Sequence, residues 1–136
     1  MVWLLALTLA LDLSAVRQEP NLEKRSDLAL EVANSEIGVA RDAYQQGRLE
    51  PSQSALVQVK EAVALSKTSL VATGKDPRKN SKYFKRAELA TREILRRLLG
   101  LRDSMDGVDR SMIDPVISEI TIVHDDLLHG VMTGSH

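Results

Sequence analysis

The 136-residue sequence contains no cysteine, and aromatic residues make up only 3% of it. The absence of cysteine excludes disulfides, thiolate zinc sites, iron–sulfur clusters, cysteine nucleophiles and haem attachment through Cys-x-x-Cys-His. With so few aromatic residues, a core has to be built from Leu, Val, Ile and Ala. Such a core suits helices packed on helices better than a β-sandwich or barrel. The length allows one domain.

An excess of charge of one sign is also missing, since 18 Lys and Arg face 19 Asp and Glu, for a net charge of −1. A nearly neutral chain gives no overall reason to expect a nucleic-acid partner. The phosphate-binding loop, the Gly-x-Ser-x-Gly nucleophile motif and the His-Glu-x-x-His zinc motif are absent from the sequence. We therefore expect a protein that is not an enzyme, with no catalytic residues and no cofactor.

The first eleven residues are apolar except for Thr8. This run is too short for a membrane anchor, which needs about 20 residues, but it fits the hydrophobic region of a signal peptide. Ala15 offers a small residue for cleavage, although no Lys or Arg precedes the run and Leu13 is large for this position. We predict a signal peptide at residues 1–15 and export of residues 16–136, to the periplasm or the medium. The alternative is an ordinary N-terminal helix of a cytoplasmic protein.

Helix start and stop signals divide the rest of the chain into four segments of similar length. They cover residues 21–46, residues 51–73, a third segment that starts at 76 or 80 and ends at 106, and a fourth that starts at 111 or 114 and fades at 130. Asn21 is a candidate N-cap, and Gly47 follows the first segment. Because short connections force consecutive helices to run antiparallel, we predict an all-α fold, an antiparallel up-down four-helix bundle of two αα-hairpins.

The third segment has the clearest helical periodicity, with core-type residues recurring at intervals of three and four. These residues are Phe84, Ala87, Thr91, Ile94, Leu98, Leu101 and Met105. The predicted core of the bundle includes Leu56, Val63, Phe84, Ile94, Leu98, Ile120 and Leu127. Apolar flanks at Leu95 and Leu99 leave self-association open.

The first two segments also resemble a tetratricopeptide hairpin, through Ala40, Tyr44, Gly47, Leu49 and Ala62. This pattern predicts a TPR-like helical adaptor that binds proteins, but such repeats need further copies to cover their faces. The second half of the chain shows no matching positions. A simple αα-hairpin accounts for the same residues.

The neutral total hides a strong asymmetry, because residues 75–102 carry a net charge of +7 and residues 103–136 carry −6. One explanation is that two neighbouring helices have flanks that attract each other. The other is a binding site at the start of the third segment, where basic side chains and free backbone N–H groups can hold an anion. We predict that an unknown protein or an anionic surface, rather than nucleic acid, contacts Arg78, Lys79, Lys82, Lys85 and Arg86. No membrane span is expected in the mature chain.

The three histidines allow one further alternative. His124 and His129 are five residues apart, about 140° around a helix, so they cannot bind one metal ion from the same face. Asp125 and His129 do share a face and are weak metal candidates, although zinc needs three or four ligands. The alternative function is a metal- or haem-binding bundle that uses His124, Asp125 and His129. More simply, we expect His124 to lie beside the core and to hydrogen-bond to a carbonyl or a carboxylate.

Two stretches carry a resemblance to other proteins. They are Lys-Tyr-Phe-Lys-Arg-Ala-Glu-Leu at residues 82–89 and Val-His-Asp-Asp-Leu-Leu at residues 123–128. Both are similar to stretches of small exported helical proteins of bacteria that have no established function. The resemblance implies export and brings no functional residues with it.

Overall fold

The computed structural model describes residues 12–134, and every regular element in this range is helical. The elements are α2 (Leu13–Arg17), α3 (Leu22–Gln45), α4 (Leu49–Ala72), α5 (Ser81–Ser104), the 3₁₀ helix η1 (Gly107–Met112) and α6 (Asp114–Thr133). The predicted all-α class is confirmed, with four long helices. None of these helices combines the length and the hydropathy that a bilayer span requires.

The helix ends follow local signals in the sequence. The Asn21 side chain caps α3 as predicted, because its Oδ1 accepts a hydrogen bond from the Lys24 N–H at 3.0 Å. Beyond α3 the chain turns at Gly47, whose φ of 74° lies in the left-handed region that favours glycine. Of the two predicted starts for α5, the later one is correct. The last segment, predicted to fade at Gly130, continues as α6 to Thr133.

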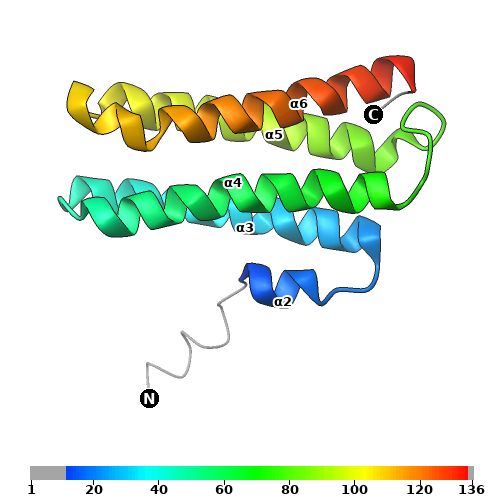
Figure 1. Ribbon diagram of the computed structural model, residues 1–136, viewed down its shortest axis with the longest axis horizontal. Coiled ribbons are helices and arrows are strands. Elements are labelled where there is room, and N and C mark those ends of the chain that lie inside the picture. The colour runs from blue at the N-terminus through cyan, green and yellow to red at the C-terminus, as the bar shows by residue number, and fades with distance from the viewer. Residues whose placement is uncertain (1–11, 135–136) are drawn as a thin grey trace.

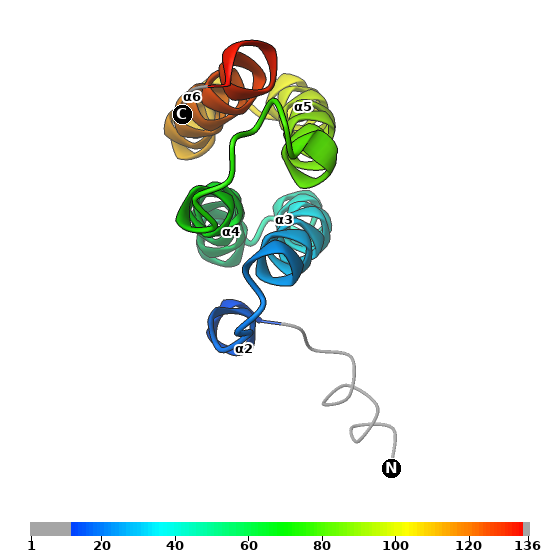
Figure 2. The same cartoon turned by 90° about the vertical axis from the view of Figure 1, so that its right-hand side faces the viewer.

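The long helices form two hairpins, α3 with α4 and α5 with α6, and consecutive helices run in opposite directions (Figure 1). Viewed end-on, the hairpins lie in two layers, with α5 beside α3 and α6 beside α4 (Figure 2). In the order predicted for a simple up-down bundle, α4 and α5 would be close neighbours, but α4 packs more extensively against α6. The link of residues 73–80 crosses between the layers and buries Pro77, which permits this arrangement.

The core lies between the two layers and continues to α2. All seven predicted core residues are buried, with at most 3% of each exposed. Leu13 and Val16 of α2 are also buried and pack on α3. Most of the predicted signal peptide lies outside the described residues, but its predicted cleavage point after Ala15 falls within α2.

Candidate functional site

The predicted anion site lies on the link of residues 73–80 and the first two turns of α5. We call this site the basic turn. Its residues are Lys75, Arg78, Lys79, Lys82, Lys85 and Arg86. In the link, the Asp76 side chain accepts a hydrogen bond from the Arg78 N–H at 2.8 Å, and the Asp76 carbonyl accepts one from the Asn80 N–H at 2.9 Å. These bonds, together with buried Pro77, fix the link from which α5 starts.

Two cations of the basic turn are paired with carboxylates of α3. Lys75 Nζ lies 3.2 Å from Glu23 Oε2, and Arg86 Nη1 lies 2.5 Å from Asp27 Oδ2. The sequence suggested that the acidic last helix would supply such partners. Instead α3 supplies them, because α5 lies beside α3.

Four cations of the basic turn have no ion-pair partner among residues 12–134. They are Arg78, Lys79, Lys82 and Lys85, and all four are exposed. The Lys82 ammonium lies 5.4 Å from the centre of the Tyr83 ring, and the Arg86 guanidinium lies 5.1 Å from it. Tyr83 is half-buried, and the face of its ring attracts both cations through cation–π interactions. A hollow of about 320 Å³ next to Tyr83 is lined by Glu23, Lys79 and Lys82, among other residues.

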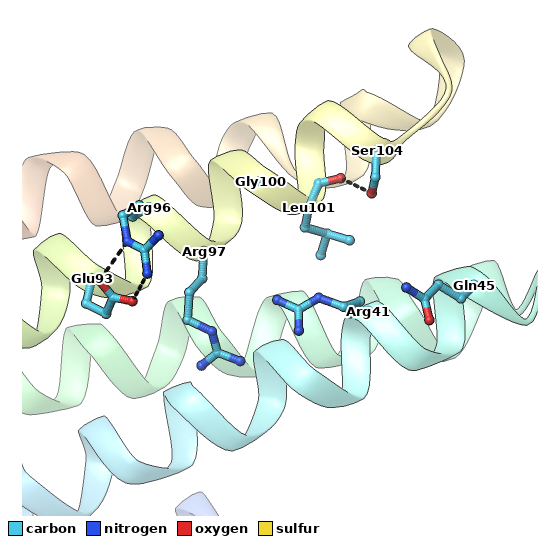
Figure 3. A pocket seen from close by; sticks show the side chains of 8 residues that line it. All are labelled: Arg41, Gln45, Glu93, Arg96, Arg97, Gly100, Leu101 and Ser104. Atoms are coloured by element: carbon cyan, nitrogen blue, oxygen red, sulfur yellow. Dashed lines mark hydrogen bonds and ion pairs between the residues drawn. The ribbon is translucent and has the colours of Figure 1, made fainter.

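A second cluster of cations lies between the C-terminal halves of α3 and α5, around a hollow of about 490 Å³. Figure 3 shows Arg97 reaching from α5 toward α3, while Arg41 and Gln45 of α3 lie opposite Gly100 and Leu101. Sequence reasoning counted Arg97 among the charges but did not place it in a site. No local signal could have done so, because Arg41 and Arg97 meet only through the packing of two distant helices.

The pairing of these arginines is uneven. Arg96 binds the Glu93 carboxylate through two hydrogen bonds of 2.8 and 2.5 Å, and this pairing lowers the pKa of Glu93. Arg97 Nη1 donates only to the neutral Asn34, at 3.1 Å to its carbonyl oxygen and 3.0 Å to Oδ1. Arg41 has no ion-pair partner within the described range. With three guanidinium groups and one carboxylate, the hollow has a net charge of +2.

His124 is half-buried where α6 packs against α5. Its Nε2 lies 2.7 Å from Glu88 Oε2, as predicted for a histidine that hydrogen-bonds to a carboxylate beside the core. Arg92 holds the same carboxylate, with Nη2 at 2.9 Å from Oε1. Glu88 is only 6% exposed, so it is a buried carboxylate of α5 that also contacts α6 through His124. Sequence reasoning missed Glu88, although Arg92 four residues later signals a helical ion pair.

The weak metal candidates gain no further ligands. Asp125 and His129 are exposed, and His124 Nδ1 lies 3.5 Å from Asp125 Oδ1. Across residues 12–134, no group of three His, Asp or Glu side chains is placed to hold a metal ion.

No protein-family model, curated protein or solved structure matches this chain. Its function has to be inferred from the fold and from the charges described above. The resemblance to small exported helical proteins of bacteria stays a prediction.

Proposed function

We propose that this chain is a non-catalytic interaction domain, an antiparallel four-helix bundle of two αα-hairpins whose basic turn binds an anionic partner. The observation that carries this proposal is the set of four exposed cations without ion-pair partners in the described range, at Arg78, Lys79, Lys82 and Lys85. Like charges held close together repel one another, so a partner that neutralises them binds favourably.

The contrast with the rest of α5 supports this proposal. Farther along the helix, Arg92 pairs with Glu88, Arg96 with Glu93 and Arg102 with Asp114. Arg97 is the one later cation of α5 without a carboxylate partner in the described range. The first turn of α5 also lacks a side-chain cap, so its backbone N–H groups add to the positive potential there. The basic turn is therefore where α5 concentrates uncompensated charge.

A TPR-like adaptor is a second candidate function, which the stacking of the hairpins favours. The first helices of the two hairpins lie side by side, and so do the second helices, as in stacked helical repeats. However, α3 begins at Leu22 and α5 at Ser81, a spacing much longer than the ~34 residues of a tetratricopeptide repeat. Both candidates bind proteins, and they differ in whether further repeats extend the stack.

A metal- or haem-binding bundle has less support. His124 is engaged with Glu88, and the exposed Asp125 and His129 offer only two ligands. Metal analysis and an absorption spectrum of protein purified without an affinity tag test this alternative. Stoichiometric metal or a haem absorption band would favour it over the proposal.

Export with removal of residues 1–15 stays a prediction. The apolar run at residues 1–11 supports export, whereas buried Leu13 has a place in the folded domain that cleavage after Ala15 would remove. The intact mass of the protein from its native host decides between them. A chain that starts at residue 16 supports export, and a full-length cytoplasmic chain contradicts it.

The proposal is tested with charge-matched triple variants. The test variant is Arg78→Gln/Lys82→Gln/Lys85→Gln, and the control is Arg17→Gln/Arg48→Gln/Lys60→Gln, in which all three cations lie outside the basic turn. Binding to polyglutamate and to anionic vesicles is measured at rising salt, which screens exposed charges beyond about 8 Å at physiological ionic strength.

We expect about tenfold weaker binding for the test variant and little change for the control, since each exposed charge contributes up to ~1 kcal/mol. Equal binding of the two variants would show that the basic turn is only a solvated flank.

A further inference from the structure

Three hollows lie on the surface between α3 and α5. They follow one another from the N-terminal to the C-terminal end of both helices. The first, of about 320 Å³, lies at the basic turn, and the second, of about 410 Å³, lies between Leu28 and Ala90. The third, of about 490 Å³, is the hollow beside Arg41 and Arg97. Because α3 and α5 run side by side in the same direction, we call these hollows together the α3–α5 groove.

The charge along this groove is uneven. Its two ends carry the unpaired cations, with Lys79 and Lys82 at one end and Arg41 at the other. In the middle hollow, Arg86 is paired with Asp27, and the charges of Lys24 and Glu31 cancel. The apolar part of its lining comes from Leu28, Leu30 and Ala90. A ligand that matches this pattern carries negative charge at both ends and neutral or apolar groups at its centre.

We propose that the α3–α5 groove binds an extended acidic peptide segment of a partner protein. One acidic cluster of the peptide contacts the basic turn, and a second binds Arg41 and Arg97. The planar guanidinium fork matches a carboxylate in a bidentate geometry, which suits arginine to the second contact. This inference rests on the function proposed for the basic turn and names the class of its partner.

The dimensions set the spacing of the two acidic clusters. Lys82 and Arg97 both belong to α5, and at about 1.5 Å per residue they lie about 22 Å apart along its axis. An extended peptide advances about 3.3 Å per residue. The two clusters should therefore be separated by about seven residues.

The position of Arg97 favours a peptide over a membrane. Its side chain is half-buried and reaches toward α3 (Figure 3). There it donates a hydrogen bond to the Asn34 carbonyl. A flat bilayer surface can contact exposed lysines of the basic turn, but it does not enter a groove between two helices. An extended chain can reach the three hollows in turn, because they follow one another along α3 and α5.

Gly100 keeps the far end of the groove open. It lies in the interior of α5 beside Arg97, and a Cβ built on it meets no atom within 4 Å. A larger side chain at this position has room for its Cβ and would project into the hollow that Gly100 lines. Gly100→Leu is therefore a way to fill the site while leaving every charge in place.

The test measures the binding of labelled peptides by fluorescence anisotropy. The spaced peptide has two Asp-Glu pairs with about five alanine and leucine residues between them, so that the centres of the pairs are about seven residues apart. The block peptide has the same composition with its acidic residues adjacent. The proteins are the full chain, Arg41→Gln/Arg97→Gln, Gly100→Leu, and the charge-matched control Arg48→Gln/Lys60→Gln on the α4 side. Circular dichroism confirms that each variant is folded.

We expect the spaced peptide to bind the wild-type chain about tenfold more tightly than the block peptide. We also expect Arg41→Gln/Arg97→Gln to weaken the binding of the spaced peptide about tenfold, since two charge-assisted contacts together provide about 1.4 kcal/mol or more. Gly100→Leu should weaken it by a similar factor, because its side chain occupies the space that the peptide needs. The control variant should stay within about twofold of wild type. Because Gly100→Leu removes no charge or hydrogen bond, loss of binding in this variant points to the hollow itself.

Three results would overturn the inference. If the two groove variants bind as wild type does while the basic-turn triple variant loses binding, the proposed function stands and the groove is not the site. If anionic vesicles bind and depend on Arg41 and Arg97 as the peptide does, the partner is a membrane surface. If the wild-type chain binds neither peptide nor vesicles, both the inference and the proposed function are wrong.

Discussion

The interface between α3 and α4 is lined by small side chains, whereas α5 and α6 meet through large ones. On α3 the buried Ser26, Ala33 and Ala40 are spaced by seven residues, and on α4 so are Ala55, Ala62 and Ser69. The buried residues of the second hairpin include Phe84, Ile94, Leu98, Ile120 and Leu127. Since the distance between packed helices depends on the side chains at the contact, the first hairpin is the more closely packed pair.

The two hairpins also bury different polar groups. In the first, the Ser26 and Ser66 hydroxyls share a hydrogen bond of 2.7 Å, and Ser52 Oγ donates to the Ala40 carbonyl at 2.8 Å. In the second, Thr91 Oγ1 donates to the Ala87 carbonyl at 2.9 Å, and the buried charged group is the Glu88 carboxylate, with Arg92 and His124 as partners. Among the buried hydroxyls of α3 and α4, those of Ser26, Ser52 and Ser66 have partners, whereas Ser69 Oγ has none within the described residues. A buried carboxylate is more costly to leave unpaired and needs cationic or polar partners. The first hairpin therefore packs through small side chains and neutral hydroxyls, whereas the second encloses a charged group between its helices.

The largest effect is expected from removing a large side chain in the second hairpin. Leu98 is fully buried on the α5 stripe, and Leu98→Ala should cost about 2–5 kcal/mol of unfolding free energy because it leaves a cavity. Urea denaturation followed by circular dichroism measures this loss. A cost below ~1 kcal/mol would mean that this stripe does not form the core.

The opposite substitution tests the first hairpin. Ala62 is fully buried in α4, and Ala62→Leu should cost about 1–3 kcal/mol because the added methyl groups push the close-packed helices apart. Exposed Ala64, on the same helix, provides the matched control, and Ala64→Leu should change stability by less than about 0.5 kcal/mol. If both substitutions are neutral in urea denaturation, the interface has room and the contrast between the hairpins fails.

A smaller effect should come from the hydrogen-bonded contact between Glu88 of α5 and His124 of α6. Glu88→Gln and His124→Gln, alone and combined, form a double-mutant cycle, and we expect a coupling energy of about 1 kcal/mol between the two side chains. The same cycle on Lys67 and Asp126, a more exposed pair between α4 and α6, should give about 0.5 kcal/mol or less. Coupling energies in the reverse order would show that burial does not strengthen the Glu88–His124 contact.

Sequence reasoning predicted the features that depend on nearby residues. The cap at Asn21, the turn at Gly47 and the buried α5 stripe follow from patterns within a few helical turns. The pairing between the hairpins was not predictable in this way, because a link as long as residues 73–80 permits α5 to lie beside either α3 or α4. The partners of Lys75 and Arg86 on α3, and the hollow beside Arg41 and Arg97, depend on that pairing.

The smallest expected effect is a gain in stability at Gly100. Glycine inside a helix costs about 0.5–1 kcal/mol relative to alanine, and nothing lies within 4 Å of a Cβ at this position, so Gly100→Ala should stabilise the chain by about that amount. Gly38 in α3 has the same open surroundings, and Gly38→Ala should give a similar gain. Thermal unfolding measures both variants. A destabilised Gly100→Ala chain alongside a stabilised Gly38→Ala chain would mean that α5 needs glycine at residue 100 for its backbone. The design of Gly100→Leu as a purely steric block of the groove would then fail, because that variant would disturb the helix as well as fill the hollow.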